Sequence, residues 1–155
     1  MVSRRPIRCG VLLVRHAVAA GHRLCNLARA SLCVDGRVDK ILVVDDEGHI
    51  ADVVAMFLRE EGLAVLTAGD GLEALEITRE EHPRLVLTDV MMPRMDGVDL
   101  CRRLRDDPST GAPVVLFMSA VMRIDLSGCG AAGLIRKPFD LDDLLDTVRR
   151  HLVAA

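Results

Sequence analysis

The chain has 155 residues, the usual length of one compact domain, and half of these residues are apolar. That share is enough to form a buried core, so the composition excludes a wholly disordered protein. Aromatic residues make up only 2% of the chain, with no Trp or Tyr. Their scarcity argues against a surface on which the bases of single-stranded nucleic acid could stack.

The net charge of −3 is divided unevenly along the chain. Residues 1–37 contain seven Arg and one acidic residue, whereas residues 38–155 contain 13 basic and 22 acidic side chains. The acidic part lacks the positive surface that duplex DNA requires, so we expect no direct contact with nucleic acid. We interpret residues 1–37 as a basic N-terminal extension, poorly ordered or absent from the native product, and residues 38–155 as the folded domain.

The five cysteines are irregularly spaced and odd in number, which does not indicate a disulfide framework. No apolar run approaches the ~18 residues that a membrane span needs. We therefore expect a cytoplasmic protein that has no membrane partner.

Short apolar runs alternate with helical patterns from residue 40 onward. The predicted strands are residues 41–44, 64–68, 85–88, 113–118 and 134–136. Apolar residues at helical spacing predict helices over residues 50–58 and 72–81, around residues 100–104, and over 141–152. The segment before the fifth strand is short and contains Gly128 and Gly130, so we expect a short or irregular helix there. This alternation predicts a doubly wound, flavodoxin-like α/β fold with five parallel strands in the order 2-1-3-4-5 and helices on both faces.

Polar residues stand at four of the five predicted strand ends. Asp45 and Asp46 follow the first strand, Asp89 the third, Ser119 the fourth and Lys137 the fifth. In a parallel sheet these ends lie along one edge, where ligands bind. Each residue also has a structural interpretation, because Asp and Ser often cap helices or form turns. Lys137 is harder to explain in this way, since the chain contains 18 Arg and only two Lys.

Three carboxylates at one edge would repel one another, and a divalent cation would offset that repulsion. Carboxylate oxygens without nearby His or Cys favour Mg²⁺ or Mn²⁺. Lys137 adds a point charge suited to a phosphate, and Ser119 adds a hydrogen bond. A central carboxylate can itself act as the nucleophile, so the pattern predicts a phosphoryl-transfer site that forms an aspartyl-phosphate.

Four segments together resemble the receiver domains of bacterial two-component response regulators, over about residues 39–153. They are ILVVDDE (41–47), LVLTDVMMPRMDG (85–97), VVLFMSA (114–120) and LIRKPF (134–139). The resemblance implies that Asp89 accepts a phosphoryl group from a phosphohistidine on a sensor kinase or phosphotransfer protein. It also implies that Ser119, the backbone N–H of Ala120, and Lys137 contact the phosphoryl group.

The resemblance further implies a set of metal ligands: Asp45 through water, Asp46, Asp89 and the backbone carbonyl of Met91. It implies that the Lys137–Pro138 peptide is often cis and that Asp96 caps the third helix. The sequence departs from the family at Leu134, where an aromatic residue usually stands. The aromatic half of the family's switch is therefore not carried over.

We expect a stand-alone receiver, monomeric or weakly dimeric, that catalyses only its own phosphorylation and dephosphorylation. It would signal through protein contacts or a phosphorelay to an unknown downstream protein. Two alternatives are a small Mg²⁺-dependent phosphohydrolase and a binding module that works without phosphorylation. Met91 counts against the first, because a general acid would be expected two residues after the nucleophile.

Overall fold

A five-stranded parallel sheet forms the centre of the molecule. The computed structural model describes residues 33–34, 37–121 and 128–154. The strands β3 (Lys40–Val44), β4 (Ala64–Ala68), β5 (Leu85–Asp89), β6 (Val114–Ser119) and β7 (Gly133–Arg136) lie side by side in the order β4-β3-β5-β6-β7. Numbered along this sheet alone, that is the predicted order 2-1-3-4-5.

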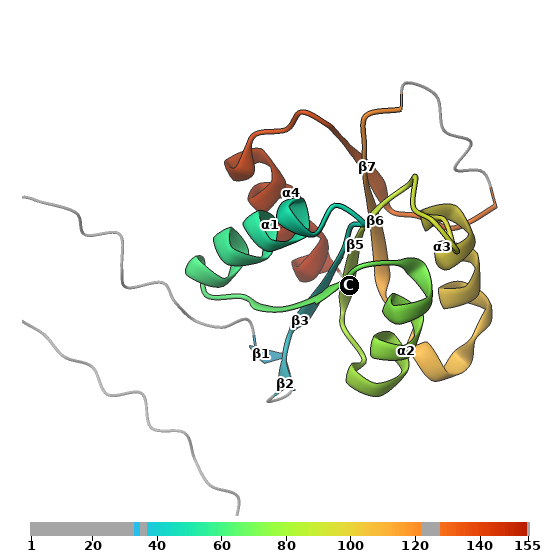
Figure 1. Cartoon of the computed structure of the whole chain (residues 1–155). Helices are drawn as coiled ribbons and strands as arrows, with labels where there is room; N and C mark the ends of the chain where they lie inside the picture. Colours follow the sequence, from blue (N-terminus) through green and yellow to red (C-terminus); the bar gives the residue numbers. More distant parts are fainter. Residues whose placement is uncertain (1–32, 35–36, 122–127, 155) are drawn as a thin grey trace, which may run out of the picture.

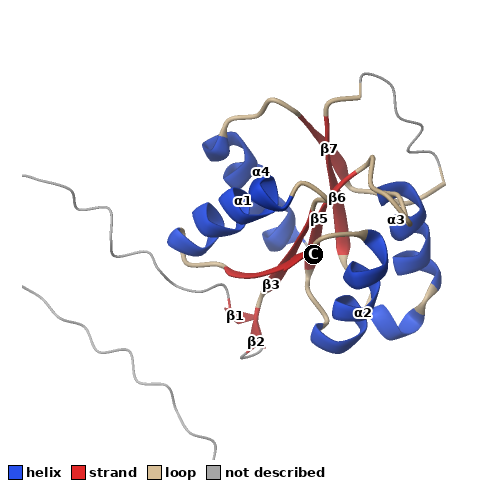
Figure 2. Ribbon diagram, viewed as in Figure 1, coloured by secondary structure: helices blue, strands red, loops and turns tan. Residues whose placement is uncertain are grey.

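Helices of the described part of the chain cover both faces of the sheet, as Figures 1 and 2 show. The helices α1 (Gly48–Glu60) and α4 (Leu141–Ala154) pack on one face, and α2 (Gly71–Glu81) and α3 (Gly97–Asp106) pack on the other. Each face has its own apolar cluster, because alternate residues of a strand point to opposite sides. In β3, Ile41 and Val43 contribute to the first cluster and Leu42 and Val44 to the second.

Aspartate side chains cap the starts of α2 and α3. The Asp96 carboxylate accepts a hydrogen bond from the backbone N–H of Asp99 at 2.7 Å, which confirms Asp96 as the cap of α3. Asp70 caps α2 in the same manner. The C-terminus of α3 continues through Asp107 into the short helix η1 (Pro108–Thr110).

The N-terminal extension lies largely outside the described residues. The short strands β1 (Cys33–Val34) and β2 (Arg37–Val38) pair in antiparallel fashion, so the boundary expected after residue 37 falls inside β2. The expected short helix before β7 falls mostly on residues 122–127, which are also outside the described part. The residues after that gap form a turn at 128–129 and enter β7 at Gly133.

The two cysteines whose side chains are described, Cys101 and Cys129, are buried and form no disulfide. The Cys101 thiol donates to the backbone carbonyl of Cys129 at 3.2 Å. Burial, followed by the hydrogen bond and charge of Cys129, raises the pKa of Cys101 to about 12. This thiol is therefore a protonated core group at neutral pH. None of the described helices combines the length and apolar character that a membrane crossing needs.

Gly97 allows the closest backbone contact near the end of β5. A Cβ atom at this position would lie 2.2 Å from the backbone oxygen of Asp89, and the Gly97 N–H donates to the carbonyl of Val90 at 3.0 Å. The start of α3 therefore packs directly on the last residue of β5, which only glycine permits.

We expect Gly97→Ala to destabilise the protein by at least about 2 kcal/mol, because the added methyl group meets backbone atoms that cannot rotate away. Gly48→Ala is the matched control, since nothing lies within 4 Å of a Cβ there, at the start of α1. Its free energy of unfolding should stay within about 0.5 kcal/mol of the parent. Urea denaturation measures both values, and equal values for the two variants would contradict this account of the packing.

Candidate phosphoryl-transfer site

Lys137 joins the ends of three strands. Its ammonium Nζ lies 2.7 Å from Oδ2 of Asp45 and 2.8 Å from Oδ1 of Asp89. Asp45 directly follows β3, Asp89 ends β5 and Lys137 directly follows β7. Residues separated by 92 and 48 positions in the chain therefore meet at one edge of the sheet.

Asp89 is held from two sides. One carboxylate oxygen accepts from Lys137, and the other accepts from the backbone N–H of Met91 at 2.7 Å. The residue is 8% exposed, so one edge of the carboxylate remains reachable. The Met91 side chain, by contrast, is turned into solvent.

The neighbouring residues Asp45 and Asp46 differ in their surroundings. Asp45 is buried, and its Oδ1 accepts from the backbone N–H of Glu47 at 3.0 Å. Asp46 is exposed and forms no side-chain hydrogen bond or ion pair with the part of the chain that the structure describes. Asp45 thus belongs to the Lys137 network, while Asp46 borders it.

Ser119 lies beside this network without a described side-chain contact to Asp89 or Lys137. Its hydroxyl accepts from the backbone N–H of Val121 at 3.1 Å, and its carbonyl accepts from the backbone N–H of Lys137 at 2.9 Å. Asp89 pairs with Met118 in the sheet, one residue before Ser119. Ala120 is exposed at the same edge. The Lys137–Pro138 peptide is cis.

Burial would by itself lower the pKa of Lys137, but the hydrogen bonds and charges of Asp45 and Asp89 outweigh it. The net result is a pKa of Lys137 above its usual value. The ammonium therefore stays charged at neutral pH, where it compensates two carboxylates that burial would otherwise destabilise.

The donor groups at this edge suit a hard divalent cation, since they are carboxylate and backbone oxygens without His or Cys. Among the described residues, however, no three Asp, Glu, His or Cys side chains form a ready-made metal cluster. Lys137 contacts two of the carboxylates, and the third is turned outward. Mg²⁺ fits such an edge, because it is commonly held by one or two carboxylates and several waters.

Two residues near the site were missed by the sequence interpretation. Asp70 is buried and forms an ion pair with Arg94, which lies in the loop between β5 and α3. A signal for Asp70 was present, because Asp followed by Glu three residues later is a pattern typical of helix starts. Nothing in the sequence indicated that Arg94 would reach it.

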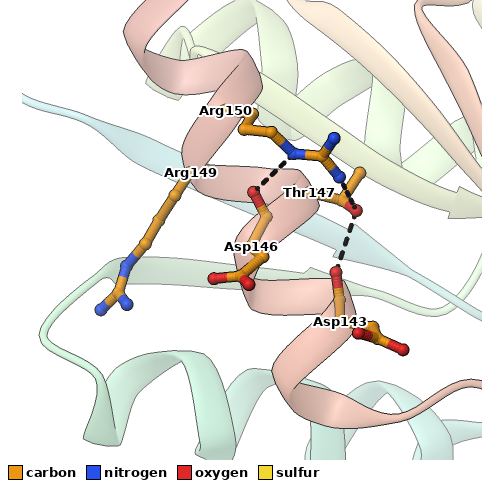
Figure 3. Close-up of a pocket in the computed structure, with 5 residues that line it drawn as sticks. All are labelled: Asp143, Asp146, Thr147, Arg149 and Arg150. Carbon is orange, nitrogen blue, oxygen red and sulfur yellow. Dashed lines mark hydrogen bonds between the residues drawn. The ribbon is translucent and has the colours of Figure 1, made fainter.

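A surface hollow in the described part of the chain lies away from this edge. It has a volume of about 650 Å³ and is lined by α4 alone, as Figure 3 shows. Its lining residues are Asp143, Asp146, Thr147, Arg149 and Arg150. They bond largely to one another and to the turns of their own helix, and none belongs to the predicted site.

Comparison with known proteins finds a family match over residues 41–149, to the response regulator receiver domain. The DNA-binding response regulator MtrA of Mycobacterium tuberculosis is 39% identical over 122 residues, which are 77% of this chain and 53% of that protein. The probable transcriptional regulatory protein TcrX of the same organism is 38% identical over 76% of this chain and 51% of its own length.

Solved structures agree with the fold. The chemotaxis protein CheY4 of Vibrio cholerae matches with a TM-score of 0.68 and 30% identity, over 72% of this chain and 97% of that one. The receiver domain of the hybrid histidine kinase CckA matches with a TM-score of 0.61 and 34% identity, over 73% and 98%. These likenesses agree with the doubly wound sheet and the predicted family.

The chain spans about half the length of the curated relatives that it matches. MtrA is named as a DNA-binding response regulator, and TcrX is named as a probable transcriptional regulatory protein. Their names conflict with the expectation of a protein that makes no direct contact with nucleic acid.

We expect Lys137→Met to destabilise the protein by roughly 1–3 kcal/mol at pH 7, because two carboxylates lose their shared charged donor. The pKa of Lys137 is higher in the folded than in the unfolded chain. The stability that the Lys137 ammonium contributes to the fold is therefore complete below its unfolded pKa of about 10.4. This contribution is lost as the pH rises through the pKa of Lys137 in the folded chain.

The difference in unfolding free energy between parent and variant should stay level from pH 7 to about pH 9.5 and shrink above about pH 10.4. Urea denaturation at a series of pH values measures it. A difference that grows with rising pH would contradict this assignment.

Proposed function

The chain belongs to the response regulator receiver family, and we propose that it accepts a phosphoryl group on Asp89 from a phosphohistidine donor. The observation that supports this most directly is the contact of Asp89 with Lys137 beside the buried Asp45. Receiver domains are signalling modules that interact with histidine kinases or phosphotransfer proteins. The reactions that we propose for this chain are the gain and the loss of a phosphoryl group on Asp89.

In the proposed step, an oxygen of the Asp89 carboxylate bonds to phosphorus while the P–N bond of phosphohistidine breaks. The imidazole leaves with the bonding electrons, and Asp89 becomes an acyl phosphate. Positioning and charge compensation carry most of such a reaction. Lys137 supplies a positive charge already in contact with the nucleophile, and it can pair with the incoming phosphoryl oxygens.

The family generally binds Mg²⁺ at its acidic pocket, and Mg²⁺ or Mn²⁺ would neutralise charge on the phosphoryl oxygens. We propose that the carboxylates of Asp46 and Asp89 and the backbone carbonyl of Met91 hold the ion, with Asp45 assisting through water. Ser119 and the backbone N–H of Ala120 are proposed to donate to the phosphoryl group. The Ser119 hydroxyl can accept from the backbone N–H of Val121 and donate its own O–H at the same time.

An apolar surface beside the site suits a protein donor. Val53 and Met56 on α1 are 49% and 57% exposed. A hollow of about 290 Å³ next to them is lined by His49, Ile50, Val53, Val54, Phe139 and Leu141. Exposed apolar groups gathered in this way favour protein contact, and we propose that the donor protein covers them.

The names of the relatives suggest what phosphorylation would regulate in a longer protein. In a protein of the length of MtrA, phosphorylation of the receiver would regulate DNA binding. For the residues described here, we propose contact with a partner protein or onward phosphoryl transfer. The cytoplasmic location stays a prediction.

Acetyl phosphate with Mg²⁺ should add one phosphoryl group, seen as a mass gain of the intact protein. Asp89→Asn or chelation of the metal should abolish the gain. Asp96→Asn is the matched control, because Asn can also cap α3 and Asp96 lies outside the site. The absence of any gain in the parent would favour a module that works without phosphorylation, and repeated hydrolysis of an external phosphate ester would favour a phosphohydrolase.

Val53→Asp should slow phosphotransfer from a histidine kinase that phosphorylates the parent, by on the order of tenfold, because it places a charge in the proposed apolar contact. Phosphorylation by acetyl phosphate should stay unchanged, since that donor needs no protein surface. Radiolabel transfer from the kinase measures the first rate and intact mass the second. Equal slowing with both donors would mean that Val53 affects the site and not docking.

A further inference from the structure

The loop that follows Asp89 is attached to the start of α2 by an ion pair. Asp70 is 3% exposed, and its Oδ1 accepts from the backbone N–H groups of Leu72 and Glu73 at 2.8 and 3.1 Å. Its other oxygen, Oδ2, pairs with the guanidinium of Arg94. One carboxylate oxygen thus caps the helix, and the other holds the loop.

Arg94 makes this contact from an unusual backbone conformation. Its φ is +66°, in the left-handed region that residues other than glycine seldom adopt. Its side chain is 64% exposed, yet the guanidinium reaches a carboxylate that is almost wholly buried. Such backbone strain persists only where the surroundings enforce it, and the ion pair is an interaction that can do so.

A second contact fixes the same loop against the same helix. A Cβ on Gly71 would lie 2.7 Å from the backbone oxygen of Met95 and 2.8 Å from its Cγ, and Met95 is 4% exposed. The loop backbone therefore packs directly on the first turn of α2. With Arg94 and Asp70, this makes two adjacent attachments at the tip of the loop.

The base of the loop is fixed independently, by the bond from the Gly97 N–H to the Val90 carbonyl. Met91 lies between base and tip, and its N–H donates to Oδ2 of Asp89 at 2.7 Å. The backbone that orients the nucleophilic carboxylate is thus held at both ends. The tip is held by the Arg94 and Met95 side chains, which lie outside the Lys137 network.

We propose that Arg94, through its ion pair with Asp70, is a positioning residue for the Asp89 site. It holds the loop over residues 90–96 so that the backbone of Met91 stays aligned with the Asp89 carboxylate. This role in phosphoryl transfer rests on the proposed function, whereas the alignment of Met91 can be measured without it.

The test uses variants that separate the ion pair from the fold. Arg94→Asn removes the charge, and Asn tolerates positive φ, so the backbone conformation is retained. Asp70→Asn removes the charge from the other side and keeps a residue that caps helices well. Arg94→Lys keeps the positive charge. Arg102→Asn is the control, because its ion pair with Asp99 at 3.1 Å is exposed and joins two residues of α3.

The first measurement is hydrogen exchange of the Met91 amide in the full chain, with no phosphoryl donor present. Arg94→Asn and Asp70→Asn should each speed this exchange by on the order of tenfold, as expected for loss of a partly buried charged contact. The amides of β3 and β5 should exchange as in the parent. The double variant should show no further increase, since both substitutions remove one interaction.

The second measurement is the rate of phosphorylation by acetyl phosphate over a range of Mg²⁺ concentrations. Both single variants should be slower by on the order of tenfold, because a small misplacement of reacting groups is costly. Arg94→Lys should recover most of the rate, and Arg102→Asn should match the parent.

Parental exchange of the Met91 amide in Arg94→Asn would overturn the proposal, as would parental phosphorylation with unchanged Mg²⁺ dependence. If the parent chain is not phosphorylated at all, the proposed function fails. The exchange of the Met91 amide then decides the positioning role alone.

Discussion

The contact of one ammonium group with two carboxylates governs the arrangement of this protein's polar edge. Asp45 and Asp89 come from neighbouring strands and would repel each other in a site with little water. Lys137 offsets that repulsion at 2.7 and 2.8 Å. The edge can therefore carry concentrated negative charge in a stable fold and remain receptive to a further cation or to a transferred group.

The fold could be predicted from the sequence because its strands and its helices have different patterns of apolar residues. Runs such as residues 41–44 are apolar at every position, as expected for a strand covered on both faces. The helices instead show apolar residues at intervals of three and four. The predicted strands differed from the observed ones by a residue or so, as for Asp89, which forms the last residue of β5. Sequence cannot easily place such ends, because they depend on which backbone groups find partners.

The site could be predicted only in part. Parallel strands bring their carboxyl ends together, so Asp45, Asp89 and Lys137 were expected to meet, and they do. The pattern did not tell which of Asp45 and Asp46 would point inward, nor that the Ser119 hydroxyl would accept from its own loop. Arg94 was missed because its role depends on a left-handed backbone and on a partner 24 positions earlier in the chain, and neither leaves a periodic signal. Leu134, where the family usually has an aromatic residue, packs partly buried against the apolar cluster beneath α2 and α3.

Lys137 also has a second attachment, through its backbone, to the carbonyl of Ser119. The main chain of Lys137 is thus hydrogen-bonded to the end of β6, next to the outer pair of strands. If a new anion attracted the ammonium group, the displacement would act directly on the backbone hydrogen bond between Lys137 and Ser119, at the ends of β6 and β7. One amino acid thus contacts the middle strands through its side chain and the outer strands through its backbone. A substitution at position 137 that keeps the positive charge but changes the length of the side chain would therefore change how strongly a bound anion acts on this backbone bond.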